Sequence, residues 1–222
     1  MDIGGKEVAM ASHNILKGKM SDHIAVASAA LKDGYVIVLP VENSYALAAD
    51  AFVHDSVRAL HVLRGDPLGT IAQVAITSAD AIDGIARNIS PEARTLMSNF
   101  WPGQLSMTLR PQPGLSWDLG DAGQLNAINV CVPSPKFISK LIKNFGPIAI
   151  ASANSYGLPA LNDHKLIKFS ESEVAAVFTA GELPNGPAST VIDATGEKME
   201  ILREGAISID QITSLVSDIS HR

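Results

Sequence analysis

Short apolar runs alternate along this chain with segments whose apolar residues recur at helical spacing. The run at 35–39 is typical of a buried strand, and the segment before it, which begins at Ser21 and Asp22 and stops at Gly34, is typical of a capped helix. Such alternation favours one open α/β domain, in which helices pack on a twisted, largely parallel sheet and short late strands pair antiparallel.

The same two patterns predict the other elements. Strands are expected at 71–76, 105–109, 127–132, 148–151, 176–179, 190–192 and 200–202, and helices at 55–63, 79–86, 91–100, 135–145 and 209–216. Residues 1–20 lack the apolar core of a secretory signal and are rich in Gly, Lys and Ser. We therefore expect a flexible lead-in at 1–20 and a single domain at 21–218.

Length, charge and cysteine content exclude several classes of protein. The chain has 222 residues, enough for one well-buried domain, and its apolar runs are far shorter than the roughly 20 residues that cross a bilayer. A net charge of −6 argues against a general nucleic-acid binder. The lone Cys131 agrees with a reducing, cytoplasmic location. The six histidines show no zinc-site spacing, so no bound transition metal is expected.

Four polar loops lie at the ends of predicted elements, where open α/β sheets usually bind ligands. They are PVENSYAL at 40–47, LRGDP at 63–67, IASANSYG at 150–157, and the pair ASTV at 188–191 and LREG at 202–205. Each alone is explained equally well as a turn, and Arg64 alone as a charge at a helix C-terminus. The sequence has no Gly-x-Ser-x-Gly elbow, P-loop or Gly-x-Gly-x-x-Gly motif, so a serine hydrolase is not supported.

In their order and spacing, these loops resemble the YrdC family of threonylcarbamoyl-AMP synthases over about 21–205. The segment at 40–47 keeps Pro40, Tyr45 and Leu47 of the family's Pro-Thr-x-Thr-x-Tyr-Gly-Leu. FWPGQLSMTL at 100–109 is similar to the family's Phe-Trp-Pro-Gly-x-Leu-Thr, and SAN at 152–154 matches outright. The series continues in order with SWDLGD at 116–121, VCVP at 130–133, STVID at 189–193 and LREG at 202–205.

The resemblance implies an open, twisted mixed sheet flanked by helices, in a single domain with a concave ligand cleft. It implies a nucleotidyltransferase that joins threonine, bicarbonate and ATP, with Mg²⁺, into L-threonylcarbamoyladenylate for tRNA threonylcarbamoyladenosine modification. Double-stranded RNA binding and tRNA-modification proteins as partners are implied as well. The residues carried over are Arg64, Ser152 and Asn154 for catalysis, these three with Thr70 and Arg203 for ATP, and Asn43, Tyr45 and Ser189 for threonine.

Two departures from the family pattern concern charge. Asp66 falls where the family places the second cation of its Lys-x-Arg pair, and Cys131 replaces the arginine of Arg-Val-Pro. At about 5 Å and an effective dielectric of about 20, each unit pair is worth roughly 3 kcal/mol. An Asp66 that faced the triphosphate would therefore impair synthesis, and restoring Asp66→Arg with Cys131→Arg would raise ATP affinity.

Three hypotheses stay open on the sequence. The first is a working synthase, in which nearby cations such as Arg110, Lys165 or Lys168 replace those lost. The second is a non-catalytic YrdC paralogue that binds nucleotide or RNA. The third is a related carbamoyl-adenylate enzyme that takes a different amine or acid.

Overall fold

The structure, a computed structural model, describes residues 11–169 and 173–221. Its strands are β1 (Ala11–Asn14), β2 (Ile37–Pro40), β3 (Tyr45–Asp50), β4 (Gln73–Ala75), β5 (Ala86–Arg87), β6 (Leu105–Pro111), β7 (Ile128–Cys131), β8 (Ile148–Ser152), β9 (Ala176–Thr179), β10 (Thr190–Asp193), β11 (Met199–Arg203) and β12 (Ile219–His221). Its α-helices are α1 (Met20–Lys32), α2 (His54–Arg64), α3 (Pro91–Phe100), α4 (Lys136–Phe145) and α5 (Ile209–Thr213), with 3-10 turns at Ala79–Gly84 and His164–Leu166.

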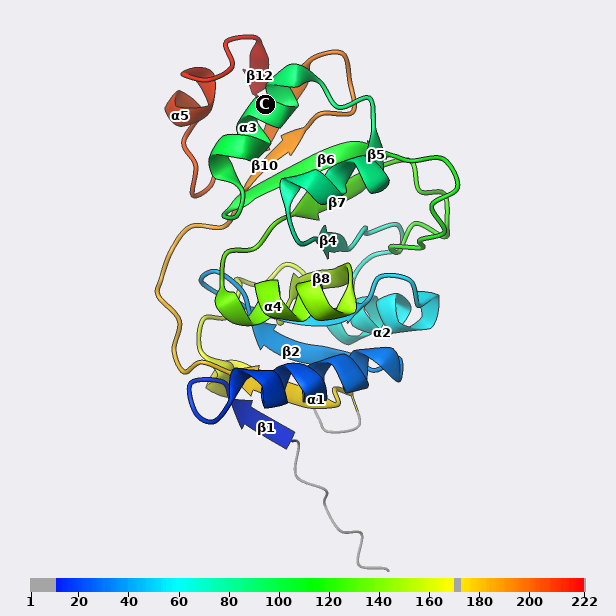
Figure 1. Ribbon diagram of the computed structural model, residues 1–222, viewed down its shortest axis with the longest axis vertical. Coiled ribbons are helices and arrows are strands. Elements are labelled where there is room, and N and C mark those ends of the chain that lie inside the picture. Colours follow the sequence, from blue (N-terminus) through cyan, green and yellow to red (C-terminus); the bar gives the residue numbers. More distant parts are fainter. Residues whose placement is uncertain (1–10, 170–172, 222) are drawn as a thin grey trace, which may run out of the picture.

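One mixed sheet runs through the described part of the molecule in the order β1-β9-β2-β3-β8-β4-β7-β6-β10-β11-β12, with β5 beside β6 (Figure 1). Its pairs β2–β3, β3–β8, β8–β4, β7–β6, β10–β11 and β5–β6 are antiparallel, whereas β1–β9, β9–β2, β4–β7, β6–β10 and β11–β12 are parallel. The expected mixed sheet flanked by helices is therefore confirmed. The expectation that it is largely parallel is wrong, because the neighbouring strands β2, β3, β8 and β4 alternate in direction.

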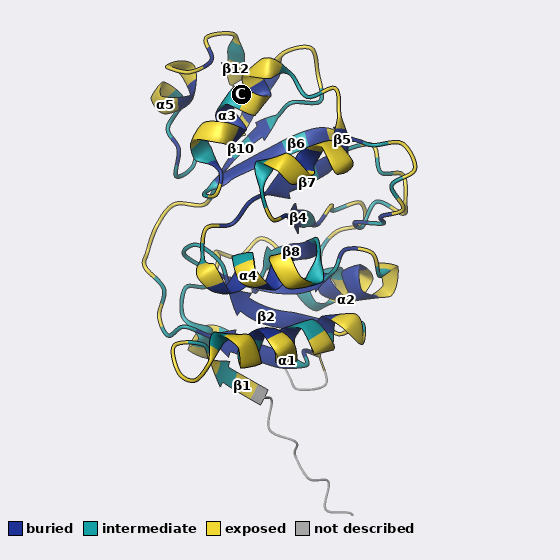
Figure 2. Ribbon diagram, viewed as in Figure 1, coloured by how far each residue is buried: buried dark blue, intermediate teal, exposed yellow. Residues whose placement is uncertain are grey.

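Helices cover both faces of the half of the sheet that contains β2. Ile37 and Leu39 pack in one buried cluster with residues of α1 and α4, whereas Val38, between them, packs in another with Leu60 of α2. Successive strand residues point to opposite faces, so a strand with helices on both sides must be apolar at every position. All four residues of β2 are accordingly buried, as Figure 2 shows.

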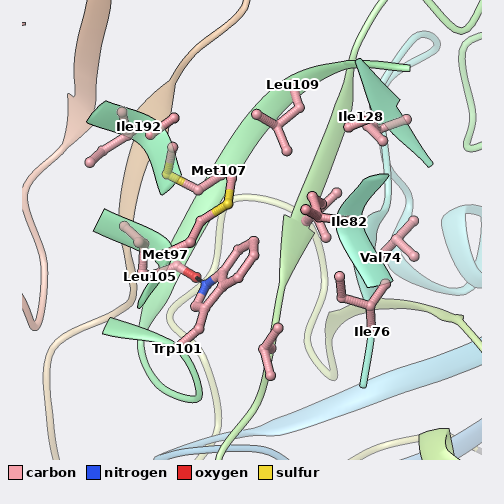
Figure 3. Packing of buried hydrophobic residues seen from close by; sticks show 14 of the residues in the cluster. Val74, Ile76, Ile82, Met97, Trp101, Leu105, Met107, Leu109, Ile128 and Ile192 are labelled. Carbon is pink, nitrogen blue, oxygen red and sulfur yellow. Dashed lines mark hydrogen bonds between the residues drawn. The ribbon is translucent and has the colours of Figure 1, made fainter. Parts of the chain in front are cut away.

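A second core fills the half of the sheet that contains β6, β7 and β10. Figure 3 shows Met97 and Trp101, from α3 and its end, against Leu105 and Met107 of β6. The indole Nε1 of Trp101 donates to the backbone oxygen of Leu105 at 2.7 Å, which satisfies the polar atom of this buried ring. Both halves thus have their own core, and the sheet is continuous between them.

The sequence located most elements within two or three residues. The helix expected at 79–86 is a short 3-10 turn, and Ala86 belongs to β5 instead. The final helix ends at Thr213, three residues before the expected end.

None of the described helices has the length and apolar character needed to cross a membrane.

The predicted domain boundaries are too narrow at both ends. β1 pairs in parallel with β9, and the ring of His13 stacks on Phe178 at a centroid distance of 5.1 Å. At the other end, β12 pairs with β11. The predicted lead-in is therefore wrong from Ala11 onward, because a short polar strand without alternation carries no sequence signal. The rest of that lead-in, residues 1–10, lies outside the described residues.

Thr190, fully buried at the start of β10, joins that strand to the turn after β11. Its Oγ1 accepts hydrogen bonds from the backbone nitrogens of Gly205 and Ile207, both at 3.0 Å, and donates to the Ile207 oxygen at 2.6 Å. One hydroxyl thus satisfies three backbone groups that are otherwise without partners in this turn.

We predict that Thr190→Val lowers the free energy of unfolding by about 2 to 4 kcal/mol, because valine keeps the shape and leaves these backbone groups unsatisfied. Thr190→Ser keeps the hydroxyl and should cost only about 1 kcal/mol for the lost methyl group. Urea denaturation of the three proteins measures both values. Equal losses for the two variants would show that packing, and not the hydroxyl, holds the turn.

Candidate functional site

A cleft of about 840 Å³ opens where the two halves of the sheet meet. The lining comes from loops and strands far apart in the chain, including 41–44, 69–73, 150–152 and 188–189. Its ionisable side chains are Glu42, His61, Arg64, Asp66 and Arg203. The expected concave cleft is thus present, and its wall is polar with both signs of charge.

Arg64, the last residue of α2, is fixed in this wall by Asp66 and by the loop after β8. Its Nε donates to both carboxylate oxygens of Asp66, at 3.1 and 3.0 Å. Its Nη1 donates to the backbone oxygens of Ser152 and of Asn154, the latter at 3.0 Å. The chain can turn back here because Gly65 has the left-handed φ of 67° that ends α2. The Arg-Gly-Asp turn and the Ser-Ala-Asn loop therefore form one connected unit.

His61 lies behind this pair and connects it to a third loop. Its Nδ1 is 2.8 Å from Oδ2 of Asp66, and its Nε2 is 2.8 Å from the backbone oxygen of Leu119. Gly120 allows this approach, because a Cβ there would lie 2.5 Å from His61 Nε2 and 2.2 Å from the Thr70 oxygen. A smaller cavity of about 500 Å³ lies beyond, and His61, Asp66 and Thr70 line both cavities.

Asp66 therefore does not stand as a free negative charge in the cleft. Its side chain is only 1% exposed, and both of its oxygens accept from Arg64 while one also contacts His61. A carboxylate paired in this way with a guanidinium group inside the protein exerts much less repulsion on a bound anion than an isolated one. The sequence analysis did not predict these partners of Asp66.

At the opposite rim, Arg203 and Asn43 hold the segment at 187–189. The Nε and Nη2 of Arg203 donate to the Ser189 oxygen at 3.1 and 2.9 Å. The Nδ2 of Asn43 donates to the Pro187 oxygen at 2.8 Å. Arg203 and Asn43, which the sequence predicts to contact ligands, therefore also hold the rim of the cleft in place. Arg203 remains exposed to solvent.

The floor of the cleft is a row of uncharged polar side chains on three adjacent strands. Gln73 of β4 donates from Nε2 to Ser106 Oγ at 2.6 Å and to Asn129 Oδ1 at 2.7 Å. Asn129 of β7 donates in turn to Thr108 Oγ1 at 3.1 Å. None of these four side chains carries a formal charge. The row offers hydroxyl and amide groups to a ligand.

Most of the predicted site residues line the cleft, namely Asn43, Arg64, Thr70, Ser152, Ser189 and Arg203. Tyr45 and Asn154 do not. Tyr45 is fully buried, accepting from Ala180 N at 2.9 Å and donating to the Gly181 oxygen at 2.6 Å, and burial raises the pKa of its hydroxyl. Asn154 is 7% exposed and its Nδ2 donates to backbone oxygens of Ser155 and Leu158, so its side chain shapes the loop.

Cys131 and the proposed replacement cations also lie outside the cleft. The thiol of Cys131 is buried in the cluster that α1 and α4 form against the sheet. Arg110, Lys165 and Lys168 are likewise absent from the lining, and Arg110 donates to the Thr195 oxygen instead. The idea that one of these three cations replaces the lost ones is therefore not supported.

The sequence analysis missed the residues of the floor, Gln73, Ser106, Thr108 and Asn129. Ser106 and Thr108 alternate with Leu105, Met107 and Leu109, so one face of β6 is polar although the strand is internal. A period-2 polar pattern in an internal strand signals a lined cavity. Within residues 11–169 and 173–221, no group of three or more His, Cys, Asp or Glu side chains is arranged to hold a metal ion.

Comparison with known proteins assigns the family. The Sua5/YciO/YrdC family model, described as "Telomere recombination", matches residues 29–205, which is most of the chain. The chain therefore belongs to this family, and the resemblance to YrdC proteins is confirmed.

Individual relatives agree with this assignment and make the chain a threonylcarbamoyl-AMP synthase-like protein. A candidate threonylcarbamoyl-AMP synthase of Mycobacterium leprae is 34% identical over 194 residues, covering 87% of each chain. The threonylcarbamoyl-AMP synthase of Pyrococcus abyssi is 28% identical over 198 residues, covering 88% of this chain and 58% of that protein. The structure of P. abyssi Sua5 complexed with L-threonine superposes with a TM-score of 0.85 at 25% identity, covering 96% of this chain and 62% of that one. This chain thus spans about three fifths of that relative.

We predict that the thiol of Cys131 does not react with iodoacetamide in the native protein near neutral pH. Burial, and secondarily the charge of Glu42, raise the pKa of this thiol far above its usual range, so the reactive thiolate is scarcely populated. Mass spectrometry should find one carbamidomethyl group after treatment in denaturant and none before it. Labelling of the folded protein at a comparable rate would place Cys131 at an accessible site.

Proposed function

We propose that this protein makes L-threonylcarbamoyladenylate from L-threonine, bicarbonate and ATP, in the cytoplasm, as a step in tRNA threonylcarbamoyladenosine modification. The observation that carries the proposal is the convergence of the family's loops on one cleft. The same 840 Å³ space is lined by Arg64, Ser152 and Arg203. The first and last of these lie more than a hundred residues apart in the sequence. A cavity of this size lies within the range of small-molecule sites.

The chemistry requires no covalent intermediate with the protein. The threonine amine takes up bicarbonate with loss of water to form a carbamate, whose oxygen then attacks the α-phosphorus of ATP. The bond to the β-phosphate breaks, and pyrophosphate leaves. The protein must therefore position the reactants and stabilise charge on the phosphates. The burial of Cys131 agrees with such a mechanism, which uses no thiol.

The polar wall suggests how these tasks are divided. The unused Nη2 of Arg64 and the hydroxyls of Thr70 and Ser152 are suited to phosphate oxygens on one side of the cleft. Arg203 and Ser189 are suited to the nucleotide or the amino acid on the other side. ATP enters as its Mg²⁺ complex, so the metal ion arrives with the substrate.

A second candidate keeps the reaction and changes the amine. The floor row of Gln73, Ser106, Thr108 and Asn129 is uncharged, and Cys131 supplies no cation there. A carboxylate is bound most strongly by a cation, so an uncharged floor favours a neutral polar group on the amine substrate. A non-catalytic paralogue that binds nucleotide or RNA is the third outcome that an assay must separate.

We predict threonine-dependent release of pyrophosphate when the protein is mixed with ATP, Mg²⁺, bicarbonate and threonine. Arg64→Ala should lower kcat/KM for ATP about tenfold or more, because a charged hydrogen-bond donor to the phosphates is lost. Arg94→Ala is the matched control, since Arg94 pairs with Asp83 on the exposed surface and lies outside the cleft. Pyrophosphate release and chromatography of the adenylate measure the reaction.

Other outcomes of the same assay separate the alternatives. Turnover with an uncharged analogue such as L-threoninamide but not with threonine would favour the second candidate. Absence of turnover with every amine, together with a melting temperature raised by ATP or by RNA, would favour a binding protein, because a ligand of the native state must stabilise it. Absence of both would exclude the proposed function.

A further inference from the structure

The side chain of Asp66 is almost completely enclosed in the wall of the cleft. This side chain is 1% exposed, against 12% for its neighbours Arg64 and His61. Three contacts of 2.8 to 3.1 Å connect it to Arg64 Nε and His61 Nδ1. A carboxylate buried to this degree is stable only when its oxygens are paired, and here both oxygens are. The side chain is therefore built into the wall and is not aimed at a ligand.

The hydrogen bonds of Arg64 show what this contact achieves. A guanidinium group has five N–H donors in a rigid plane. The Nε hydrogen points to Asp66, and the two hydrogens of Nη1 are used by the backbone oxygens of Ser152 and Asn154. The two hydrogens of Nη2 have no protein acceptor among the described contacts, and Arg64 lines the cleft. These contacts hold two edges of the guanidinium group and so fix its plane. The N–H groups of Nη2 can therefore point in only one direction.

We infer that Asp66 is a positioning residue that, through Arg64, directs a guanidinium edge at the phosphates of the nucleotide. The inference rests on the proposed function in taking a nucleoside triphosphate as the ligand. It reverses the sign of the effect expected from the sequence, where an acidic residue at this position repels phosphate. Here the carboxylate is paired with Arg64 and fixes the orientation of that cation.

His61 extends the same role to the loop at 116–121. Its two ring contacts, with Asp66 Oδ2 and with the Leu119 oxygen, connect the carboxylate to that loop. The guanidinium group of Arg64 thus keeps its positive charge in one fixed orientation at the cleft. Rigid placement of that charge matters because a flexible arginine loses side-chain entropy when it binds phosphate.

The test compares affinities for ATP and adenosine, measured by calorimetry, in the wild type and in variants at both positions. The ratio of the two affinities isolates the phosphate contribution, and the affinity for adenosine reports whether the cleft is still folded. Asp66→Ala should reduce this ratio about tenfold, as Arg64→Ala does, and the double variant should be no worse than either alone. Asp66→Asn, which keeps an acceptor for Arg64 Nε, should recover a large part of the loss.

Asp83→Ala is the control for the change in net charge. Asp83 pairs with Arg94 on the exposed surface and lines neither cavity, so its removal changes the charge equally and should leave the ratio unchanged. Asp66→Arg should lower the ratio as well, since the new cation would meet Arg64 and His61 at an enclosed position.

Each remaining outcome overturns the inference. A higher affinity of Asp66→Ala or Asp66→Arg for ATP would show that Asp66 repels phosphate. Additive losses in the double variant would show that Asp66 and Arg64 act separately, and a wild type that binds ATP no better than adenosine would show that Arg64 meets no phosphate. Failure of the proposed function would give a different result. The ratios of ATP to adenosine affinity would follow the pattern expected above, but no amine would give release of pyrophosphate.

Discussion

The pairing of β4 with β8 is the constraint on which the cleft depends. β4 is only three residues long, yet it pairs antiparallel with β8 on one side and parallel with β7 on the other. Without it the sheet would separate into two halves, each with its own helices and core. Because the backbone hydrogen bonds continue across this junction, side chains from both halves face one space, and the loops on either side can reach one ligand.

Helix placement explains why the space remains open. α1, α4 and α2 cover the half of the sheet that contains β2, and α3 and α5 lie with the other half (Figure 1). The strands at the junction are therefore free of a covering helix over the row that runs from Gln73 to Thr108. Polar side chains occupy that row because apolar ones would be exposed there, and they satisfy one another through their own hydrogen bonds. The geometry that joins the halves thus also makes the floor hydrophilic.

The sequence predicted the class of fold and some of the residues that line the cleft, for physical reasons that also show its limits. Helices such as α4 were found because Gly146 and Pro147 stop them and their apolar residues recur at helical spacing. β1 was missed because four residues with a polar centre show no alternation. Arg64, Ser152 and Arg203 were found because each lies in a polar loop at the end of an element. Tyr45 was misplaced because the same loop motif gives no information on which side of the strand a ring points, and here it points into the core.

Asp66 shows why a charge cannot be evaluated from its position in a motif alone. The effect of a carboxylate on a bound anion depends on the distance, on the dielectric between them and on the cations that already neutralise it. All three quantities are set by the fold, and the motif around Asp66 does not reveal them. His61 is five positions upstream on α2, and the Leu119 oxygen that orients it comes from a loop more than fifty residues away. A replacement that reverses charge in the sequence can therefore repel a bound anion much less than its position suggests, provided that the structure has placed a cation beside it, as it has placed Arg64.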